Sequence, residues 1–303
     1  MLGHIRVGTC SWTDPTMVRA WYPPTARSAA DRLRYYAGHF DTVEVDSTFY
    51  GLPTSGTAEL WVERTPPDFV FHIKAFAMLT RHGVKPEQLP APIRATRTFE
   101  LDQHRRILHP SPTLRHEVFH MFSDALEPLR RESKLGVILL QFPPYFVANA
   151  ANREYIREAV GLLTPDRVAV EFRHASWLEP QELDTTLSLL GSLNAAYTCV
   201  DEPRLPGPTV LPTLTAATSD LAYVRFHGRN AATWNARVAT AAERFNYLYS
   251  EPELAEWVQP IQRLREDAKT TYVMFNNCFA DYAPRNAQQM MSLLDAAPAE
   301  TDE

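Results

Sequence analysis

The chain has 303 residues, and its 30 basic and 36 acidic side chains give a formal net charge of −6 at pH 7. This charge argues against bulk attraction to nucleic acid or to an anionic membrane, so any anion binding must come from a local group of cationic residues. The 11 glycines are dispersed and form neither GxGxxG nor a P-loop motif, which argues against a dinucleotide-binding turn and a P-loop.

The three cysteines, Cys10, Cys199 and Cys278, are too few and too far apart for a disulfide framework, and none belongs to a CxxC pair. The N-terminal residues show no charged start followed by an apolar stretch and a cleavage site, and no apolar run approaches about 18 residues. We therefore expect a cytoplasmic protein in a reducing compartment, without a membrane partner.

Short runs of apolar, β-branched or aromatic residues recur along the chain and predict eight strands. These strands cover residues 5–9, 42–46, 69–74, 136–141, 167–172, 196–200, 221–226 and 271–276. Amphipathic stretches predict helices at residues 28–39, 57–64, 117–133, 153–163, 181–191, 253–268 and 285–296. The connection 201–220 carries four prolines and is expected to be a loop.

Eight strands alternating with helices favour an α/β fold, namely a single (β/α)8 TIM-barrel-like domain over residues 1–303. We expect its core at about residues 5–294, a polar tail at 297–303 and a long connection at 75–116, after the third strand. An open doubly wound sheet is the alternative, but the glycine-rich first turn that usually accompanies it is absent.

Polar side chains follow almost every predicted strand, at the end where barrel enzymes place their functional residues. They are Glu44 and Asp46, Lys74, Gln141, Glu171 with Arg173 and His174, Asp201, Arg225 with His227, and Asn276 with Asn277. Burying such groups without partners costs several kcal/mol each. The set therefore indicates either a functional site or structural ion pairs, such as Glu44 with Arg225 or Glu171 with Lys74.

Seven ordered motifs resemble the YecE-like family, a bacterial and archaeal domain of unknown function with a TIM-barrel-like fold. The motifs are GTCSW (8–12), WYP (21–23), FDTVEVDSTFYGLP (40–53), LGVILLQFPP (135–144), VEFRHASW (170–177), YVRFHG (223–228) and YVMFNNCFADYAPRNA (272–287). The resemblance spans about residues 5–294.

The resemblance implies a shared polar pocket. Its members would be Glu44, Ser47, Tyr50, Lys74, Gln141, Glu171, Arg173, His174, Trp177, Arg225, His227, Asn276 and Asn277. The chain departs from the family pattern at Cys10 and Ser11, where Ser-Gly is common, at Asp46, where Asn is common, and at Cys278, where an acidic residue is common. A cysteine nucleophile is therefore not expected, and the cysteines are interpreted as small residues at the barrel rim.

The residue set favours metal-free acid/base chemistry on a small phosphorylated, carboxylated or sugar-like substrate, without a redox cofactor. In this hypothesis Glu171 is the general base or nucleophile and is oriented by Arg173, His227 is the acid, and Glu44 is the third catalytic candidate. The expected substrate-binding residues include anion-binding Lys74 and Arg225, amide-bearing Gln141, Asn276 and Asn277, aromatic Tyr50 and Trp177, and Asp46, His174 and Asp201. Trp12 could also stack on a substrate, although ordinary packing is the preferred interpretation of each aromatic residue.

Two other enzyme classes use the same carboxylates. Glu44, Glu171, Asp201 and His227 could converge on a divalent metal, but the cationic residues from the same strand ends would compete for the carboxylates. Glu44 and Glu171 could also form a retaining glycosidase pair, which requires a separation of about 5 to 5.5 Å. Strands two and five lie nearly opposite each other in an eight-stranded barrel, which makes that separation doubtful.

The connection 75–116 is locally basic and supports a different class of function. It contains Arg94, Arg97, Arg105, Arg106, Arg115, His104, His109 and His116, against Glu87, Glu100 and Asp102. Such a segment could follow a phosphate backbone, which makes a nucleic-acid-binding protein or a metal-dependent, endonuclease-like hydrolase the alternative function. The simpler interpretation is a solvated segment whose arginines pair with neighbouring acidic residues.

Overall fold

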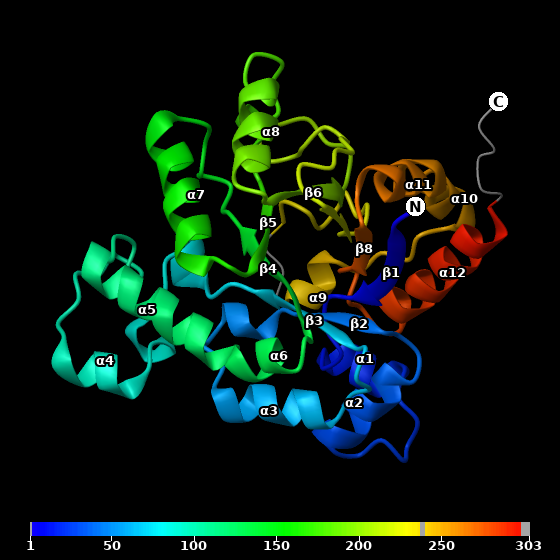
Figure 1. Cartoon of the computed structure of the whole chain (residues 1–303), viewed down its shortest axis with the longest axis horizontal. Coiled ribbons are helices and arrows are strands. Elements are labelled where there is room, and N and C mark those ends of the chain that lie inside the picture. Colours follow the sequence, from blue (N-terminus) through cyan, green and yellow to red (C-terminus); the bar gives the residue numbers. More distant parts are fainter. Residues whose placement is uncertain (1, 237–239, 298–303) are drawn as a thin grey trace. The chain divides into compact units, whose positions relative to one another are not determined.

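The computed structural model describes residues 2–236 and 240–297 (Figure 1). The eight strands form a closed parallel barrel in the order β1 to β8. Their bounds are β1 His4–Thr9, β2 Thr42–Val45, β3 Val70–Lys74, β4 Leu135–Gln141, β5 Arg167–Glu171, β6 Ala196–Asp201, β7 Leu221–Phe226 and β8 Thr270–Phe275. The predicted barrel is confirmed and the open sheet is excluded. The predicted tail at 297–303 lies outside the described residues, apart from Ala297.

The chain divides by its internal contacts into two compact units. The first unit combines Met1–Val43 with Ala196–Glu303, and the second unit is Glu44–Ala195. Helices of the first unit are α1 Pro15–Ala20, α2 Ala29–Ala37, α9 Ala241–Arg244, α10 Glu251–Ala255, α11 Val258–Asp267 and α12 Tyr282–Ala296. Helices of the second unit are η1 Ser47–Phe49, α3 Ser55–Glu63, η2 Ala77–Thr80, η3 Pro86–Gln88, α4 Ala91–Thr96, α5 Pro112–Ala125, α6 Glu127–Arg131, α7 Ala150–Leu163, η4 Ala175–Trp177 and α8 Leu183–Ser192.

In the first unit, α12 packs along β1 and β8, and α10 and α11 pack against α12 (Figure 1). The sequence predicts one helix over residues 253–268, but the structure has two, α10 and α11. Pro260 lies in the first turn of α11 and has no N–H to donate to the carbonyl of Glu256, so a continuous helix would lose a hydrogen bond there.

In the second unit, α3 packs against α5 and α6, and α5 packs against α7 (Figure 1). The predicted single helix over residues 117–133 is also wrong, because α5 ends at Ala125 and α6 begins at Glu127. Pro128 explains the break in the same way, since it cannot donate to the carbonyl of Asp124. The helix begins earlier than predicted, where Ser111 caps it by accepting a hydrogen bond from the N–H of Leu114.

The register of the second unit's strands decides which side chains share a face. Lys74 of β3 lies beside Leu139 of β4, and Gln141 of β4 lies beside Glu171 of β5. Because residues two apart on a strand point to the same side, Lys74, Gln141 and Glu171 project from one face of three neighbouring strands.

One glycine is required by a close approach between β3 and β4. A Cβ on Gly136 would lie 2.6 Å from Nδ1 of His72, a buried ring that accepts a hydrogen bond from the N–H of Val137 at 3.0 Å. The register of the two strands shifts at this point, between Phe71 and Ile73. The absence of a side chain at Gly136 leaves room for the imidazole of His72 at this irregularity. The imidazole in turn accepts the hydrogen bond of the Val137 N–H. None of the described helices is both long and apolar enough to cross a membrane.

Candidate functional site

The second unit holds a fully buried carboxylate, Glu171, at the end of β5. Its Oε1 accepts a hydrogen bond of 2.8 Å from Nε2 of Gln141, and Nε of Arg173 lies 3.3 Å from the same oxygen. A buried carboxylate is costly unless donors surround it, and here an amide and a guanidinium lie beside it. Gln141 and Arg173 are therefore the described partners of this buried oxygen.

Lys74 lies at the end of β3, where η1 holds its backbone. The hydroxyl of Thr48 donates to the carbonyl oxygen of Lys74 at 2.6 Å. The ammonium of Lys74 lies 4.7 Å from the centroid of the Phe49 ring. An ammonium in such a position is attracted by the ring quadrupole. Lys74 thus adds a second positive charge to the strand ends that carry Glu171 and Arg173.

His82 joins this group, although it does not follow any predicted strand and was not selected from the sequence. Its ring contacts Phe49 edge-on with 4.9 Å between centroids, and Nδ1 lies 2.9 Å from Oγ1 of Thr80. Burial, as the largest cause, and the positive charges of Lys74 and Arg173 together lower its pKa to about 3. We name Lys74, His82, Gln141, Glu171 and Arg173 the β3–β5 cluster.

The remaining predicted residues of the second unit have different surroundings. Trp177 is buried, stacks on Phe172 with 4.4 Å between ring centroids, and donates its Nε1–H to the carbonyl of Phe146. Nδ1 of His174 accepts a hydrogen bond of 3.2 Å from the N–H of Ser176 at the start of η4. Glu44 is fully buried, Asp46 is half-buried, and Tyr50 is 59% exposed. Packing therefore accounts for Trp177, whereas Tyr50 presents its ring to solvent.

In the first unit, Asp201 at the end of β6 is the centre of a buried hydrogen-bond network. Arg229 donates to both of its oxygens, with Nη2 2.7 Å from Oδ2. The hydroxyl of Tyr249 donates to Oδ1 at 2.6 Å, and Nε1 of Trp257 donates to Oδ2 at 2.8 Å. These four residues lock together the end of β6 and the segments around α10. Sequence reasoning could not find Arg229, Tyr249 and Trp257, because each lies far from Asp201 in the chain.

The other predicted residues of the first unit follow β7 and β8. His227 is fully buried, and its Nδ1 lies 2.9 Å from Nδ2 of Asn276, which can only donate. A neutral His227 therefore carries its proton on Nε2. Asn277 is buried and donates to the carbonyl of Tyr247 and to Oδ1 of Asn286. Arg225 lies within β7 and is also fully buried.

Two residues of the metal alternative, Asp201 and Glu171, already have protein partners. Over residues 2–236 and 240–297, no three His, Cys, Asp or Glu side chains cluster as metal ligands. Both oxygens of Asp201 already accept hydrogen bonds from protein donors, and Oε1 of Glu171 faces an amide and a guanidinium. A cation would have to displace these donors.

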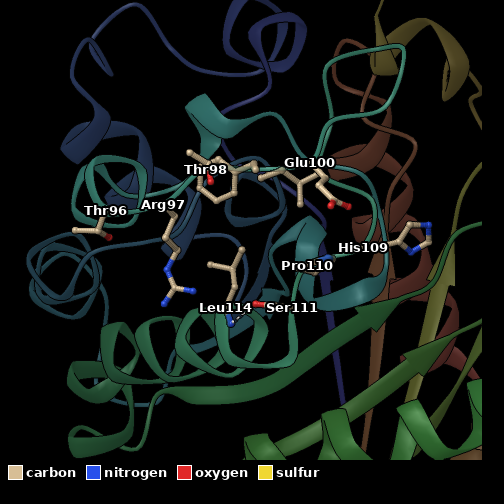
Figure 2. Close-up of a pocket in the computed structure, with 10 residues that line it drawn as sticks. Thr96, Arg97, Thr98, Glu100, His109, Pro110, Ser111 and Leu114 are labelled. Atoms are coloured by element: carbon tan, nitrogen blue, oxygen red, sulfur yellow. Dashed lines mark hydrogen bonds between the residues drawn. The ribbon is translucent and has the colours of Figure 1, made fainter.

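The connection 75–116 contains a separate cavity of about 520 Å³ (Figure 2). Its lining includes Arg97, Glu100 and His109, and Figure 2 shows Arg97 and His109 on opposite sides of the view. The lining carries charges of both signs, on Arg97 and Glu100, and Arg97 also pairs with Glu117. The cavity therefore shows no concentration of positive charge.

A closed parallel barrel with buried polar residues at its strand ends places the chain among the TIM-barrel-like proteins. It belongs to the family described as "Protein of unknown function DUF72", whose model matches residues 6–303. The chain is 31% identical to the UPF0759 protein YunF of Bacillus subtilis over 294 residues, covering 96% of this chain and 95% of that protein.

Two solved structures of DUF72 family proteins resemble the barrel. The Thermotoga maritima protein TM1631 is 31% identical, with a TM-score of 0.76 over 96% of this chain and 99% of that one. The Enterococcus faecalis protein EF0366 is 25% identical, with a TM-score of 0.75 over 97% of this chain and 99% of that one. These similarities identify the family and the fold, and they do not establish a reaction.

Proposed function

We propose that the protein is an enzyme that performs acid/base chemistry on a small anionic substrate, with Glu171 as the general base or nucleophile. The observation that carries this proposal is the β3–β5 cluster. The fully buried carboxylate of Glu171 lies beside Arg173 and Gln141, and Lys74 projects from the same face two strands away, on β3. A group of this kind combines a proton acceptor with positive charges for a substrate anion. We further take the seven YecE-like motifs to be motifs of the DUF72 family.

The residues of the cluster would divide the work. Arg173 and Gln141 hold the Glu171 carboxylate in place, since both lie within reach of its Oε1. Lys74 would attract a phosphate or carboxylate group of the substrate. His227 belongs to the first unit and not to the cluster. It remains the candidate acid, because its neutral form, whose Nδ1 lies beside Nδ2 of Asn276, would carry a donor proton on Nε2. Glu44 and Arg225, both fully buried, are further candidates outside the cluster.

The proposal is tested by turnover of a panel of phosphorylated, carboxylated and sugar-like metabolites, followed by mass spectrometry and proton NMR so that isomerisation is also detected. Glu171→Gln keeps the size of the side chain and its partner Gln141, and should lower the turnover of any converted compound by at least about 100-fold. Glu179→Gln is the matched control, because Glu179 is exposed and follows the same strand.

The folding of both variants is compared by circular dichroism and thermal unfolding. Full turnover by folded Glu171→Gln would refute the role of Glu171. If Glu171→Gln and Arg225→Ala both lost the fold, the residues would be structural and the enzyme proposal would fail.

The nucleic-acid alternative has less support. Arg106 pairs with Asp102 at 2.9 Å, Arg115 pairs with Glu158 at 2.6 Å, and Arg97 pairs with Glu117. These contacts favour the interpretation of the connection 75–116 as a solvated segment with local ion pairs. We therefore propose the small-molecule function and treat oligonucleotide binding as the outcome that would displace it.

A further inference from the structure

His82 is the member of the β3–β5 cluster whose hydrogen bonds indicate which ring nitrogen carries the proton. Oγ1 of Thr80 lies 3.2 Å from the carbonyl oxygen of Ala77 and 2.9 Å from Nδ1 of His82. A hydroxyl has one hydrogen. If Thr80 donates it to the carbonyl, which can only accept, Nδ1 of His82 must be the donor to Thr80. The neutral ring then has a lone pair on Nε2.

The other ring nitrogen is available to a ligand. The ring of His82 is half-buried, and its Nε2 has no hydrogen-bond partner among residues 2–236 and 240–297 and is not sealed from solvent. η1 contributes the edge contact of Phe49 to this ring, while the charged groups acting on it are Lys74 from β3 and Arg173 beyond β5. A bare acceptor therefore lies in the field of two cations.

We propose that His82 recognises the O–H group of a protonated oxyanion, with a phosphate monoester as the substrate class, while Lys74 and Arg173 attract its negative charge. This inference rests on the proposed function, because it assigns a ligand class to the same cluster. A carboxylate offers no O–H at neutral pH, whereas a phosphate monoester has its second pKa near about 6 and so carries a proton in part of the population. The lone pair of Nε2 thus favours phosphate over the carboxylated alternative.

Inorganic phosphate and sulfate separate charge from proton donation. At about pH 6 phosphate retains at least one proton and sulfate has none, although sulfate carries at least as much negative charge. Isothermal titration of the full-length protein should show phosphate binding about tenfold more tightly than sulfate, as one hydrogen bond would give. Charge alone would give the opposite order or none.

Variants assign this preference to individual residues. His82→Phe should abolish the preference for phosphate, and His82→Gln, which restores an acceptor oxygen, should recover part of it. Thr80→Val should also reduce the preference, since it removes the acceptor that fixes the ring. Lys74→Met should weaken the binding of phosphate and the binding of sulfate by a similar factor. His120→Gln is the control, because His120 is exposed on α5, and it should match the wild type.

Nitrogen NMR of histidine-labelled protein checks the tautomer directly. His82 should be protonated at Nδ1, whereas His174, whose Nδ1 accepts from the N–H of Ser176, should be protonated at Nε2. His82→Gln and His174→Gln assign the signals. A proton on Nε2 of free His82 would overturn the inference.

The binding outcomes separate the two proposals. Equal binding of phosphate and sulfate overturns the role of His82 and leaves the anion site of the proposed function in place. A preference that persists in folded His82→Phe does the same. Failure of both anions to bind the wild-type protein overturns the inference together with the proposed anion site.

Discussion

At the scale of single residues, we expect a large loss of stability when the carboxylate of Asp201 is removed. It is buried and accepts hydrogen bonds from Arg229, Tyr249 and Trp257. Asp201→Asn would leave the guanidinium of Arg229 with only its more exposed partners, so we expect the free energy of unfolding to fall by about 3 kcal/mol. Urea denaturation monitored by fluorescence and circular dichroism measures this change.

Glu256→Gln provides the matched control for that experiment. Glu256 binds the same guanidinium at 2.9 Å, but its side chain is 47% exposed. Water screens such a pair, so its loss should cost less than about 1 kcal/mol. Equal costs for the two variants would show that burial does not decide the strength of this network.

His82 should leave a signature in the pH dependence of stability. Its pKa is about 3 in the folded protein, through burial and then the charges of Lys74 and Arg173, against an ordinary value of 6.5. Above pH 6.5 the ring is neutral in both states and has no effect on the pH dependence. Between these two values the unfolded chain binds a proton that the folded chain does not, so stability is lost as the pH falls.

The expected size of this effect is up to about 1.4 kcal/mol for each pH unit of that window. His82→Phe lacks the titrating group. Between pH 7 and about pH 5 its free energy of unfolding should therefore rise by roughly 2 kcal/mol relative to that of the wild type. Parallel stability curves for the two proteins would contradict the shifted pKa.

The residues of the candidate site could be selected from the sequence only where their place on a strand determined the direction of the side chain. Glu171, Gln141 and Lys74 were selected because they end predicted strands, and the register does place them on one face. His82 could not be selected, because it lies in a connection whose path depends on tertiary contacts with Phe49 and Thr80. The partners of Asp201 were missed for the same reason.

At the scale of secondary-structure elements, Lys134 joins the end of α3 to the start of β4. Its side chain is buried, and Nζ donates to the carbonyl of Val62 at 3.0 Å, and to the carbonyl and hydroxyl of Thr65 at 2.8 and 3.0 Å. Lys134→Met keeps the aliphatic stem but leaves these oxygens without their donor. We expect a loss of about 2–3 kcal/mol in the free energy of unfolding.

Lys269→Met is the control for this prediction. Lys269 also precedes a strand, but its side chain is 83% exposed and only pairs with Asp220 at 3.4 Å. Surface substitutions of this kind change stability by about 0.5 kcal/mol or less. A similarly small effect of Lys134→Met would mean that water replaces the ammonium at the end of α3.

Strands were predicted more accurately than helices, and the reason is physical. A strand buried on both faces is mostly apolar, so β7 was predicted with its observed bounds, Leu221–Phe226, even though it contains Arg225. An amphipathic pattern can continue through a break in the helix, as it does across Leu126 and Trp257. The prolines that follow these two residues, Pro128 and Pro260, indicate the helix breaks in the sequence. The hydrophobic periodicity continues past them and predicts one long helix instead.

At the scale of the whole molecule, the barrel could be predicted because the order of elements restricts the topology. Eight strands separated by helices and long connections admit few arrangements, and right-handed parallel crossovers favour closure. Composition, in contrast, says little about function. The net charge of −6 is a sum that does not distinguish buried carboxylates such as Glu171 from ion pairs such as Arg106 with Asp102.

The balance of charge does predict how the protein behaves toward nucleic acid. With a net charge of −6, and with Arg97, Arg106 and Arg115 paired to carboxylates, few cations remain to release counterions from a phosphate backbone. We expect no measurable binding of labelled single-stranded or duplex oligonucleotides by fluorescence polarisation, even at about 50 mM salt. Binding that weakens steeply with salt and is lost in Arg105→Ala with Arg106→Ala, but not in Arg27→Ala with Arg34→Ala, would instead assign the connection 75–116 to nucleic-acid recognition.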